Sequence, residues 1–334
     1  MTGGVATPVH GGPDGGPPAA VDFSSNANAL GPSPMARAAL DAADPGDYPD
    51  PAYTAVRRAL ADLHDRDPAE VVVGAGACEL IHRAVRAAGG PVVVGEPTFG
   101  EYRYAAQLAR RDVRTAADRR TFVRHLPGAA LAVLCVPSVP VGVMPAAGRL
   151  ADLAAHATAT GCRLLLDLAY HPLSQARPAP PVGAWQLWAP NKAHGVTGVR
   201  AGYLLAPAAD AARLRAAPSW VLSAHGEAFL RCLPDPAAQA WVRDTRATLW
   251  RWRDDLVTDL TGLGVPVDVG DAPFLLAHVG DGAAVTARLR DCGIRVRDAS
   301  SFGAPDAVRL SAQPPPARAA LTRALADVLP AVPR

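Results

Sequence analysis

Lysine is almost absent from this sequence. Lys192 is the only lysine among 334 residues, and all other members of the 33 Lys and Arg side chains are arginines. A chain that carries its positive charge as arginine has little surface use for lysine, so the single lysine suggests a chemical role. Its primary amine, once deprotonated, can form a Schiff base with an aldehyde or ketone, which arginine cannot do. An exposed loop lysine is the structural alternative.

Cysteines, long apolar runs and targeting signals are also scarce or missing. The five cysteines are widely spaced and odd in number, which argues against a disulfide framework or a metal site and suits buried thiols in a reducing cytoplasm. No uninterrupted apolar run reaches ~20 residues, the length that a transmembrane helix needs. The N-terminus lacks a positive segment followed by an apolar one, so we expect no signal peptide. These features predict a cytoplasmic protein that does not enter a membrane.

Charge is modest and evenly mixed along the chain. The formal net charge is +2, with 19% charged and 49% hydrophobic residues, as in an ordinary globular protein. Arginines and acidic residues are interspersed, so nothing resembles a nucleic-acid-binding face. The length is sufficient for one large and one smaller domain.

From residue 71 onward, apolar strands alternate with helical stretches. The strands are continuous apolar runs, and this alternation indicates a parallel sheet covered by helices on both faces. The expected strands are 71–73, 91–94, 113–115, 129–135 and 163–167, and the helices between them cover about 99–110, 119–124 and 146–160.

The pattern changes after residue 207. A long amphipathic helix at about 235–263 precedes apolar strands at 274–279, 294–297 and 307–310, with helices at about 282–292 and 315–329. This mixture predicts a smaller α+β domain. We therefore divide the chain into a flexible N-terminal segment (1–21), a large domain (35–210) and a small domain made of 22–34 and 211–334.

Chemical signals gather where the expected strands end. One strand ends in Asp167, and a buried carboxylate is costly unless a cation faces it. A protonated pyridine nitrogen is such a cation, and Tyr170 is placed to bond a hydroxyl of the same ring. A helix N-cap or an exposed strand end is the alternative. The loop at 74–79 can offer N–H groups to a phosphate, and Arg200 suits the same ligand.

The order of these motifs resembles the class I/II aminotransferase family of pyridoxal-phosphate enzymes. The sequence has a phosphate loop, D-L-A-Y at 167–170, N-K at 191–192, a glycine-flanked arginine and V-R-L-S at 308–311. Within the family it most resembles histidinol-phosphate aminotransferase and the threonine-phosphate decarboxylase of cobalamin biosynthesis. H-G-G at 10–12, D-F-S-S-N-A-N-A-L-G-P at 22–32 and C-G-I-R-V-R-D-A-S-S-F-G at 292–303 resemble the decarboxylase in particular.

The resemblance implies a fold, a cofactor and an assembly. The fold would be α/β, with a mostly parallel seven-stranded sheet sandwiched by helices in a large cofactor-binding domain and a smaller α+β C-terminal domain. The cofactor would be pyridoxal 5′-phosphate. The partners would be a small amino-acid-like substrate and a second copy of the chain in a homodimer.

The resemblance also implies roles for individual residues. Lys192 would hold the cofactor as a Schiff base and move the substrate's α-proton, with Asp167 on the pyridinium nitrogen and Tyr170 on the 3′-oxygen. Arg309 would grip the substrate carboxylate as a bidentate fork. The other implied roles are phosphate binding by Arg200, Asn191 and the backbone at Ala77 and Cys78, ring packing by Phe99 or Tyr102, a contact of Tyr48 with the neighbouring subunit's phosphate, and contacts of Asn28 and His10 with the distal end of the substrate.

Several positions depart from the family pattern. Val139 stands where the family's N-P-x-G motif has an asparagine that bonds the 3′-oxygen, so Tyr170 would be left as that oxygen's partner. Asn191 precedes the lysine in place of Ser or Thr, Cys78 replaces an acidic residue, and D-L-A-Y replaces the commoner D-E-A-Y. The Schiff-base, ring and carboxylate positions are kept, which favours an active enzyme.

Three functions stay open at this stage. The first is an aminotransferase acting on an amino acid or phosphorylated amine, and it is the one we favour. The second is a decarboxylase of a phosphorylated amino acid, like the cobalamin-pathway enzyme. A substrate shift of about an ångström can change which bond reacts, so the sequence does not decide between them. The third is a non-catalytic relative that binds a ligand or partner.

Overall fold

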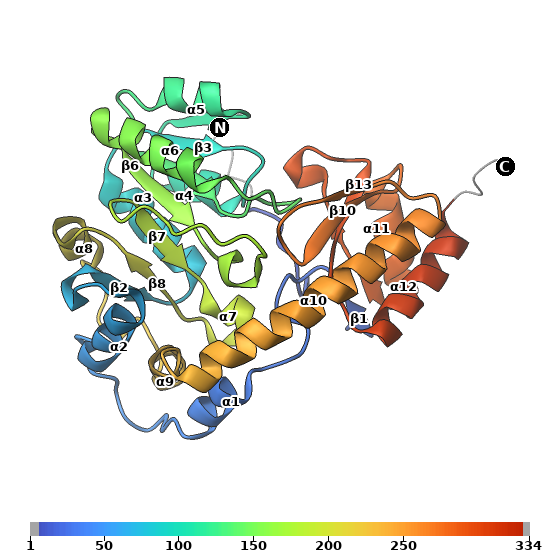
Figure 1. The fold of residues 1–334 in the computed structure, drawn as a ribbon, viewed down its shortest axis with the longest axis horizontal. Coiled ribbons are helices and arrows are strands. Elements are labelled where there is room, and N and C mark those ends of the chain that lie inside the picture. The colour runs from blue at the N-terminus through green and yellow to red at the C-terminus, as the bar shows by residue number, and fades with distance from the viewer. Residues whose placement is uncertain (1–6, 330–334) are drawn as a thin grey trace.

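The structure, a computed structural model, describes residues 7–329. It has two parts, joined by a long helix that runs along both (Figure 1). The larger part is built on a seven-stranded sheet and the smaller part on a four-stranded sheet. The predicted α/β class, with a large mostly parallel sheet and a smaller α+β part, is confirmed.

The large sheet is parallel except for one strand. Its order is β2-β8-β7-β6-β5-β3-β4, and β8 runs antiparallel to both of its neighbours. The parallel pairs place the carboxyl ends of β5, β6 and β7 at one edge of the sheet. The strands are β2 (Val71–Gly74), β3 (Val92–Gly95), β4 (Val113–Ala116), β5 (Leu131–Cys135), β6 (Arg163–Asp167), β7 (Trp185–Trp188) and β8 (Gly202–Leu205).

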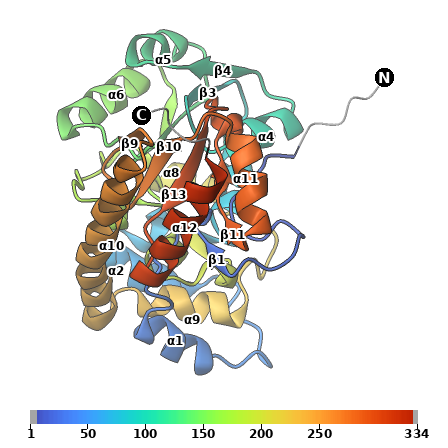
Figure 2. The same cartoon turned by 90° about the vertical axis from the view of Figure 1, so that its right-hand side faces the viewer.

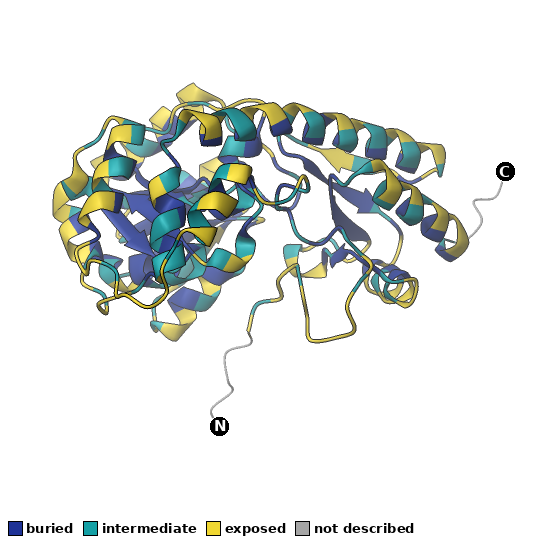
Figure 3. Cartoon of the chain, turned by 90° about the horizontal axis from the view of Figure 1, so that it is seen from below, coloured by how far each residue is buried: buried dark blue, intermediate teal, exposed yellow. Residues whose placement is uncertain are grey.

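Helices cover both faces of this sheet because successive strand side chains point to opposite sides. Val92 and Val94 pack in the core under α3 and α4, whereas Val93 packs in the core under α5 and α6. Figure 3 shows the buried strands enclosed by helices whose outer surfaces are exposed. The helices of this part are α1 (Pro34–Asp41), α2 (Thr54–His64), α3 (Ala77–Ala88), α4 (Glu101–Leu108), α5 (Arg119–His125), α6 (Ala147–Ala159), α7 (Pro190–Ala193), α8 (Ala208–Leu214) and α9 (Ala224–Cys232), with 3-10 turns η1 (Pro68–Glu70), η2 (His171–Leu173) and η3 (Thr197–Val199).

The smaller part packs helices on an antiparallel sheet of order β12-β13-β10-β9. A separate two-stranded parallel sheet joins β1, near the N-terminus, to β11 (Figure 2). The elements are β1 (Val21–Asp22), α10 (Pro236–Gly262), β9 (Val267–Val269), β10 (Phe274–His278), α11 (Gly282–Asp291), β11 (Ile294–Arg295), β12 (Arg297–Asp298), η4 (Ser300–Phe302), β13 (Ala307–Ser311) and α12 (Pro315–Val328).

One expected strand is split in the structure. The apolar run at 294–297 was predicted as a single strand, but β11 pairs with β1 and β12 pairs with β13, in two different sheets. Val296 separates the two short strands and lies buried in the core of the smaller part. The sequence pattern shows an extended stretch and gives no sign of this change of partner.

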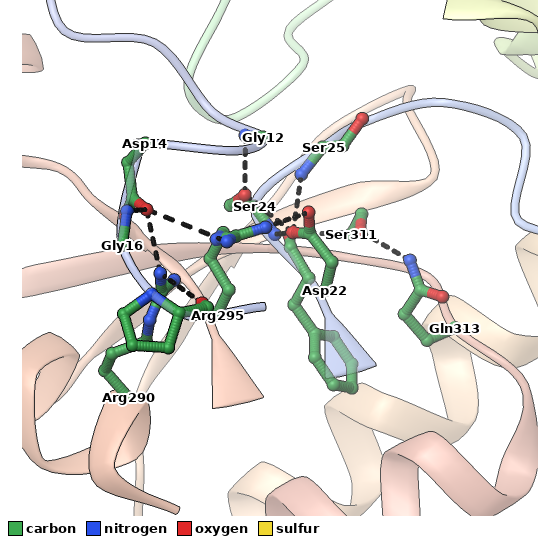
Figure 4. Close-up of polar contacts among 12 residues, drawn as sticks. Gly12, Asp14, Gly16, Asp22, Ser24, Ser25, Arg290, Arg295, Ser311 and Gln313 are labelled. Atoms are coloured by element: carbon green, nitrogen blue, oxygen red, sulfur yellow. Dashed lines mark hydrogen bonds and ion pairs between the residues drawn. The ribbon is translucent and has the colours of Figure 1, made fainter. Parts of the chain in front are cut away.

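The segments next to the expected domain boundaries make specific contacts. Asp14 pairs with Arg290, and Asp22 pairs with Arg295 and accepts hydrogen bonds from Ser24 (Figure 4). The described part of the N-terminal segment, which was expected to be flexible, is therefore attached to the smaller part. Residues 222–233, expected in the small domain, contribute to a core shared with β2 and β8. This packing favours a domain boundary at the start of α10.

Candidate active site

A cavity of about 460 Å³ lies between the two parts, at the carboxyl ends of the central strands. Its lining comes from both parts and from the N-terminal segment. It brings together most of the side chains singled out in the sequence: His10, Ala77, Cys78, Phe99, Asp167, Tyr170, Asn191, Lys192, Arg200 and Arg309. Asn28 and Tyr48 are not part of this lining.

Asp167 ends β6 and lies in the cavity wall. Within residues 7–329 its hydrogen bonds come from neutral groups: the Tyr102 hydroxyl at 2.9 Å, the Ala169 N–H at 3.0 Å and the more distant Cys135 thiol. Burial raises the pKa of Asp167, and these hydrogen bonds and the nearby Lys192 ammonium only partly oppose that effect. Because desolvation penalises the charged form, the carboxylate would gain most from a cation placed directly against it.

The phosphate-binding elements predicted from the sequence also meet at the cavity. Helix α3 begins here, and its first residues, Ala77 and Cys78, line the wall. Gly76 has φ +83°, and a Cβ at this residue would lie 2.8 Å from Arg200 Nη2. Glycine therefore keeps open the space between the helix N-terminus and the guanidinium, where the unpaired N–H groups of the first turn favour an anion. Asn191 Oδ1 is buried there without a hydrogen-bond partner among the described residues.

One wall of the cavity is apolar and aromatic. Phe99 lines it, whereas Tyr102, the alternative ring-packing residue, is fully buried behind it and bonded to Asp167. Tyr170 packs edge-on against Phe274, with ring centroids 5.1 Å apart. Val139, which stands where the family motif has an asparagine, packs with Ala272 in the same apolar cluster as Tyr170 and Phe274.

Two buried arginines from the smaller part face the cavity. Arg297 and Arg309 lie opposite each other on β12 and β13. All hydrogen bonds of both guanidinium groups within residues 7–329 go to backbone carbonyls or to the Ser301 hydroxyl. Burial lowers the pKa of Arg297 to about 10, and the nearby Arg309 charge adds to this effect. The wall therefore carries two cationic groups, and among residues 7–329 neither forms an ion pair, although the Asp298 charge partly opposes the lowering of the Arg297 pKa.

Arg297 was not recognised from the sequence, although a signal was available. It lies in the expected strand at 294–297, and a charged residue in a buried strand is the same kind of signal that identified Asp167. The N-terminal contribution was also largely missed. Val9, Gly11, Ser24 and Asn26 line the cavity, and Arg297 Nη2 donates to the Val9 carbonyl at 2.9 Å.

Three other predicted residues occupy distinct places. His10 lies at the cavity, 3.1 Å from Glu101 and with its ring 5.2 Å from the Phe99 ring. Asn28 lies outside the cavity lining, and its side-chain amide donates to the Ala193 carbonyl and to Thr245. Tyr48 is 82% exposed and packs on Trp220, so it does not reach the cavity of its own chain.

Two other kinds of site find no support in the described part of the chain. Across residues 7–329, no three His, Cys, Asp or Glu side chains are arranged to hold a metal ion. Nor does any helix among these residues combine the length and the apolar character that spanning a bilayer requires.

Comparison with known sequences agrees with this geometry. The sequence profile of the family described as "Aminotransferase class I and II" matches residues 18–328. The histidinol-phosphate aminotransferase of Halorubrum lacusprofundi is 30% identical over an alignment that covers 87% of this chain and 84% of the relative. The enzyme of that name from Dinoroseobacter shibae is 29% identical, with 87% and 86% covered.

Solved structures show the same fold. Histidinol-phosphate aminotransferase from Sinorhizobium meliloti, in complex with pyridoxal-5′-phosphate, superposes with a TM-score of 0.82 at 24% identity and covers 93% of this chain and 90% of its own. L-threonine-O-3-phosphate decarboxylase from Porphyromonas gingivalis superposes with a TM-score of 0.80 at 21% identity, with 91% and 98% covered.

Proposed function

We propose that this chain, which belongs to the aminotransferase class I and II family, transfers the amino group of a doubly anionic amino compound. Membership of the family makes it a pyridoxal-phosphate enzyme, and its histidinol-phosphate aminotransferase relatives support a transaminase. The substrate class and the roles of individual residues are our inferences.

The residues at the cavity fit pyridoxal phosphate. The open space at Gly76, between the α3 N-terminus and Arg200, suits its phosphate. Asp167, whose pKa burial raises, suits a protonated ring nitrogen. When bound, the cofactor's ring accepts the electron pair released as a bond to the substrate's α-carbon breaks.

The chain's own residues would carry the remaining steps. Lys192 would hold the cofactor through its amine and, once the substrate displaces it, take a proton from the substrate and return it. Asp167 would keep the ring nitrogen protonated. Arg309 would fix the substrate's carboxylate by a bidentate contact and thereby set which bond faces the ring. Phe99 would pack against the ring and keep water away from it.

The observation that carries the substrate proposal is the pair Arg297 and Arg309. Like charges directly opposite each other on neighbouring strands destabilise a sheet, and these two are buried at 5% and 6% exposure. A ligand with two anionic groups would neutralise both. A carboxylate with a phosphate, or one phosphate contacting both guanidinium groups, meets this requirement, and the histidinol-phosphate enzymes resemble this chain throughout.

Decarboxylation of a phosphorylated amino acid is the second candidate. It is favoured by the position of His10, which belongs to the H-G-G segment that resembles the cobalamin-pathway decarboxylase and lines the cavity. Both reactions would use the same residues, and they differ in the bond to the α-carbon that is aligned for cleavage.

A homodimer is the assembly that we propose. Tyr48 is exposed and cannot reach the cavity of its own chain, so its implied phosphate contact would need a second copy. Sedimentation of the cofactor-bound protein, with and without Tyr48→Ala, tests this. A monomer at micromolar concentration with full cofactor binding would contradict it.

A single-turnover absorbance experiment tests the proposed function. Purified protein is mixed with pyridoxal phosphate and then O-phospho-L-threonine, and released carbon dioxide is trapped. Conversion of the cofactor to its amine form without gas supports transamination, whereas gas with the original absorbance restored supports decarboxylation. Lys192→Ala is the control, and a loss of turnover of about 10³-fold or more is expected. Absence of a protein-bound cofactor band in the wild type would contradict the whole proposal.

A further inference from the structure

The segment 28–33 donates hydrogen bonds to three consecutive carbonyl groups, 192–194, in the turn that carries Lys192, which we call the lysine turn. The backbone N–H of Asn28 donates to the Lys192 carbonyl at 2.9 Å, and its side-chain amide donates to the Ala193 carbonyl at 3.0 Å. The N–H of Ser33 donates to the His194 carbonyl at 2.9 Å. Helix α7 has only four residues, and the turn itself supplies only a long hydrogen bond to these carbonyls, from the Gly195 N–H to the Lys192 carbonyl at 3.4 Å. The position of the turn that carries Lys192 is therefore set by the segment 28–33.

Glycine allows this close approach. Gly195 follows the three carbonyls at φ +66°, and a Cβ there would overlap the carbonyl oxygen of Gly31. Any other residue would push the segment 28–33 away from the lysine turn.

Both polar atoms of the Asn28 amide have hydrogen-bond partners. Its nitrogen donates both to the Ala193 carbonyl and to Thr245 Oγ1, the latter at 2.9 Å, and its oxygen accepts from the Leu30 N–H at 3.1 Å. The Thr245 hydroxyl donates its own hydrogen to the Trp241 carbonyl, which leaves its oxygen free to accept. A buried amide with three matched partners has one stable orientation.

Thr245 belongs to α10, the helix shared by the two parts of the molecule. Helix α10 contacts η2 of the large part and β9, β10 and α12 of the smaller part, and Figure 1 shows it running alongside both. The Asn28–Thr245 hydrogen bond therefore connects the lysine turn to the element whose position depends on how the two parts are arranged.

We propose that Asn28 is a positioning residue for Lys192, and that its bond to Thr245 makes the position of the amine depend on α10. This role rests on the proposed function of Lys192. A misplacement of about 1 Å in a reacting group can cost about 10²-fold in rate, so a fixed backbone under the amine has direct chemical value.

Three variants separate positioning from general stability. Asn28→Ala removes the side-chain bonds to Ala193 and Thr245. Thr245→Val keeps the shape of residue 245 and removes its hydroxyl, which accepts from Asn28 and donates to the Trp241 carbonyl. This variant is used if Asn28→Ala does not fold. Ser33→Ala is the matched control, because it removes the hydroxyl that caps α1 and meets His194 but keeps the backbone bond to the lysine turn.

The first measurement uses the cofactor-free protein. The only lysine is labelled with an amine-acylating reagent over a range of pH, and the extent is read by mass spectrometry with the N-terminal amine as internal reference. Asn28→Ala should change the labelling rate of Lys192 several-fold and shift its pH profile, and Thr245→Val should act in the same direction by less. Ser33→Ala should lower the melting temperature and leave the profile unchanged.

The second measurement uses the cofactor-bound enzyme with O-phospho-L-threonine. Asn28→Ala should lower kcat by about 10²-fold. KM should change by less than threefold, because the variant leaves intact the two arginines that we propose bind the substrate, Arg297 and Arg309. Equal profiles and kcat in wild type and Asn28→Ala would overturn the proposal, as would the same changes in Ser33→Ala. If the wild type binds no pyridoxal phosphate, the proposed function fails, while the labelling profile still decides whether Asn28 sets the amine's environment.

Discussion

The Tyr102 hydroxyl donates a hydrogen bond to Asp167 Oδ2 at 2.9 Å inside the core of the large part. Tyr102 is fully buried, and burial raises the pKa of both side chains. A neutral phenol can orient the carboxylate, but it cannot supply the positive charge that a desolvated carboxylate needs. Without a ligand, the buried charge of Asp167 therefore lowers the stability of the folded protein.

Asp167→Asn should separate stability from activity. The pKa of Asp167 is raised in the folded protein, so the native state holds this proton to higher pH than the unfolded chain does, and stability falls as pH rises from about 4 through the raised value. Asparagine has no such charge. The cofactor-free variant should melt at or above the wild-type temperature at pH 8, with a smaller difference at pH 4, while kcat falls by at least about 10²-fold.

Asp210→Asn is the control for this comparison. Asp210 accepts from Arg163 at 2.9 Å and from the Trp185 ring nitrogen at 3.0 Å, so its charge is paired. Its substitution should lower the melting temperature and leave kcat near the wild-type value. A fall in melting temperature for Asp167→Asn like that of the control would contradict the prediction.

Arg297→Gln should change substrate selectivity. Removing one of two facing buried cations should leave the cofactor-free protein as stable as the wild type or more stable. For O-phospho-L-threonine we expect kcat/KM to fall by about 10²-fold, because one partner of a buried charge pair between enzyme and substrate is lost. For L-alanine, which has one anionic group, kcat/KM should change little. Steady-state kinetics with both amino donors checks this.

The control variant for selectivity is Arg295→Gln. Arg295 lies two residues earlier and pairs with Asp22 at 3.3 Å, so its loss should reduce stability without altering the preference between the two donors. An unchanged preference in Arg297→Gln would remove the support for a doubly anionic substrate.

Val139→Asn restores the residue that the family motif has at this position. Val139 is buried beside Ala272 and Phe274, so an amide there should destabilise the cofactor-free protein by about 1–3 kcal/mol. Bound cofactor should offset part of this loss, because the 3′-oxygen attached to its ring would give the amide a partner. Thermal unfolding with and without pyridoxal phosphate measures the difference, and Val139→Leu controls for size. Equal losses in both states would show that the amide finds no partner on the cofactor.

His278 predicts a pH dependence of stability away from the cavity. Its two ring nitrogens lie 2.9 Å from Asp306 and from Asp268, and hydrogen bonds to these carboxylates raise the pKa of His278. A raised pKa in the folded state adds stability that is present below the unfolded value, near 6.5, and is lost as pH rises through the folded value. Urea unfolding should therefore show a larger gap between wild type and His278→Gln at pH 6 than at pH 9. A gap that grows with pH would contradict this assignment.

The sequence predicted the parts of this fold that follow from continuous patterns. The valines at 71–73 and 92–94 form uninterrupted apolar runs with no alternating polar residues, and they form strands β2 and β3, whose side chains are buried on both faces of the sheet although β2 lies at its edge. Asp167 was recognised because a carboxylate at the end of such a strand needs a cation. Both inferences use only the local sequence and the cost of burying charge.

The features that the sequence did not predict depend on contacts between distant residues. The change of sheet between β11 and β12 is decided by pairing with β1, 273 residues earlier in the chain. Asn28 was predicted to contact the distal end of the substrate, whereas the partners of its amide in the structure are the Ala193 carbonyl and the Thr245 hydroxyl, 165 and 217 residues away. The charge of Arg297 in an apolar strand was visible in the sequence, but its position opposite Arg309 was not.

The single lysine has a consequence for the protein in a living cell. Acyl phosphates, thioesters and reducing sugars react spontaneously with exposed amines, and in most proteins such damage is spread over many surface lysines without effect. This protein has a single lysine side-chain amine, that of Lys192, and Lys192 lines the cavity. Any chemical ageing of lysine in this protein would therefore act directly on the amine that we assign to the cofactor, and bound cofactor would protect the enzyme against it.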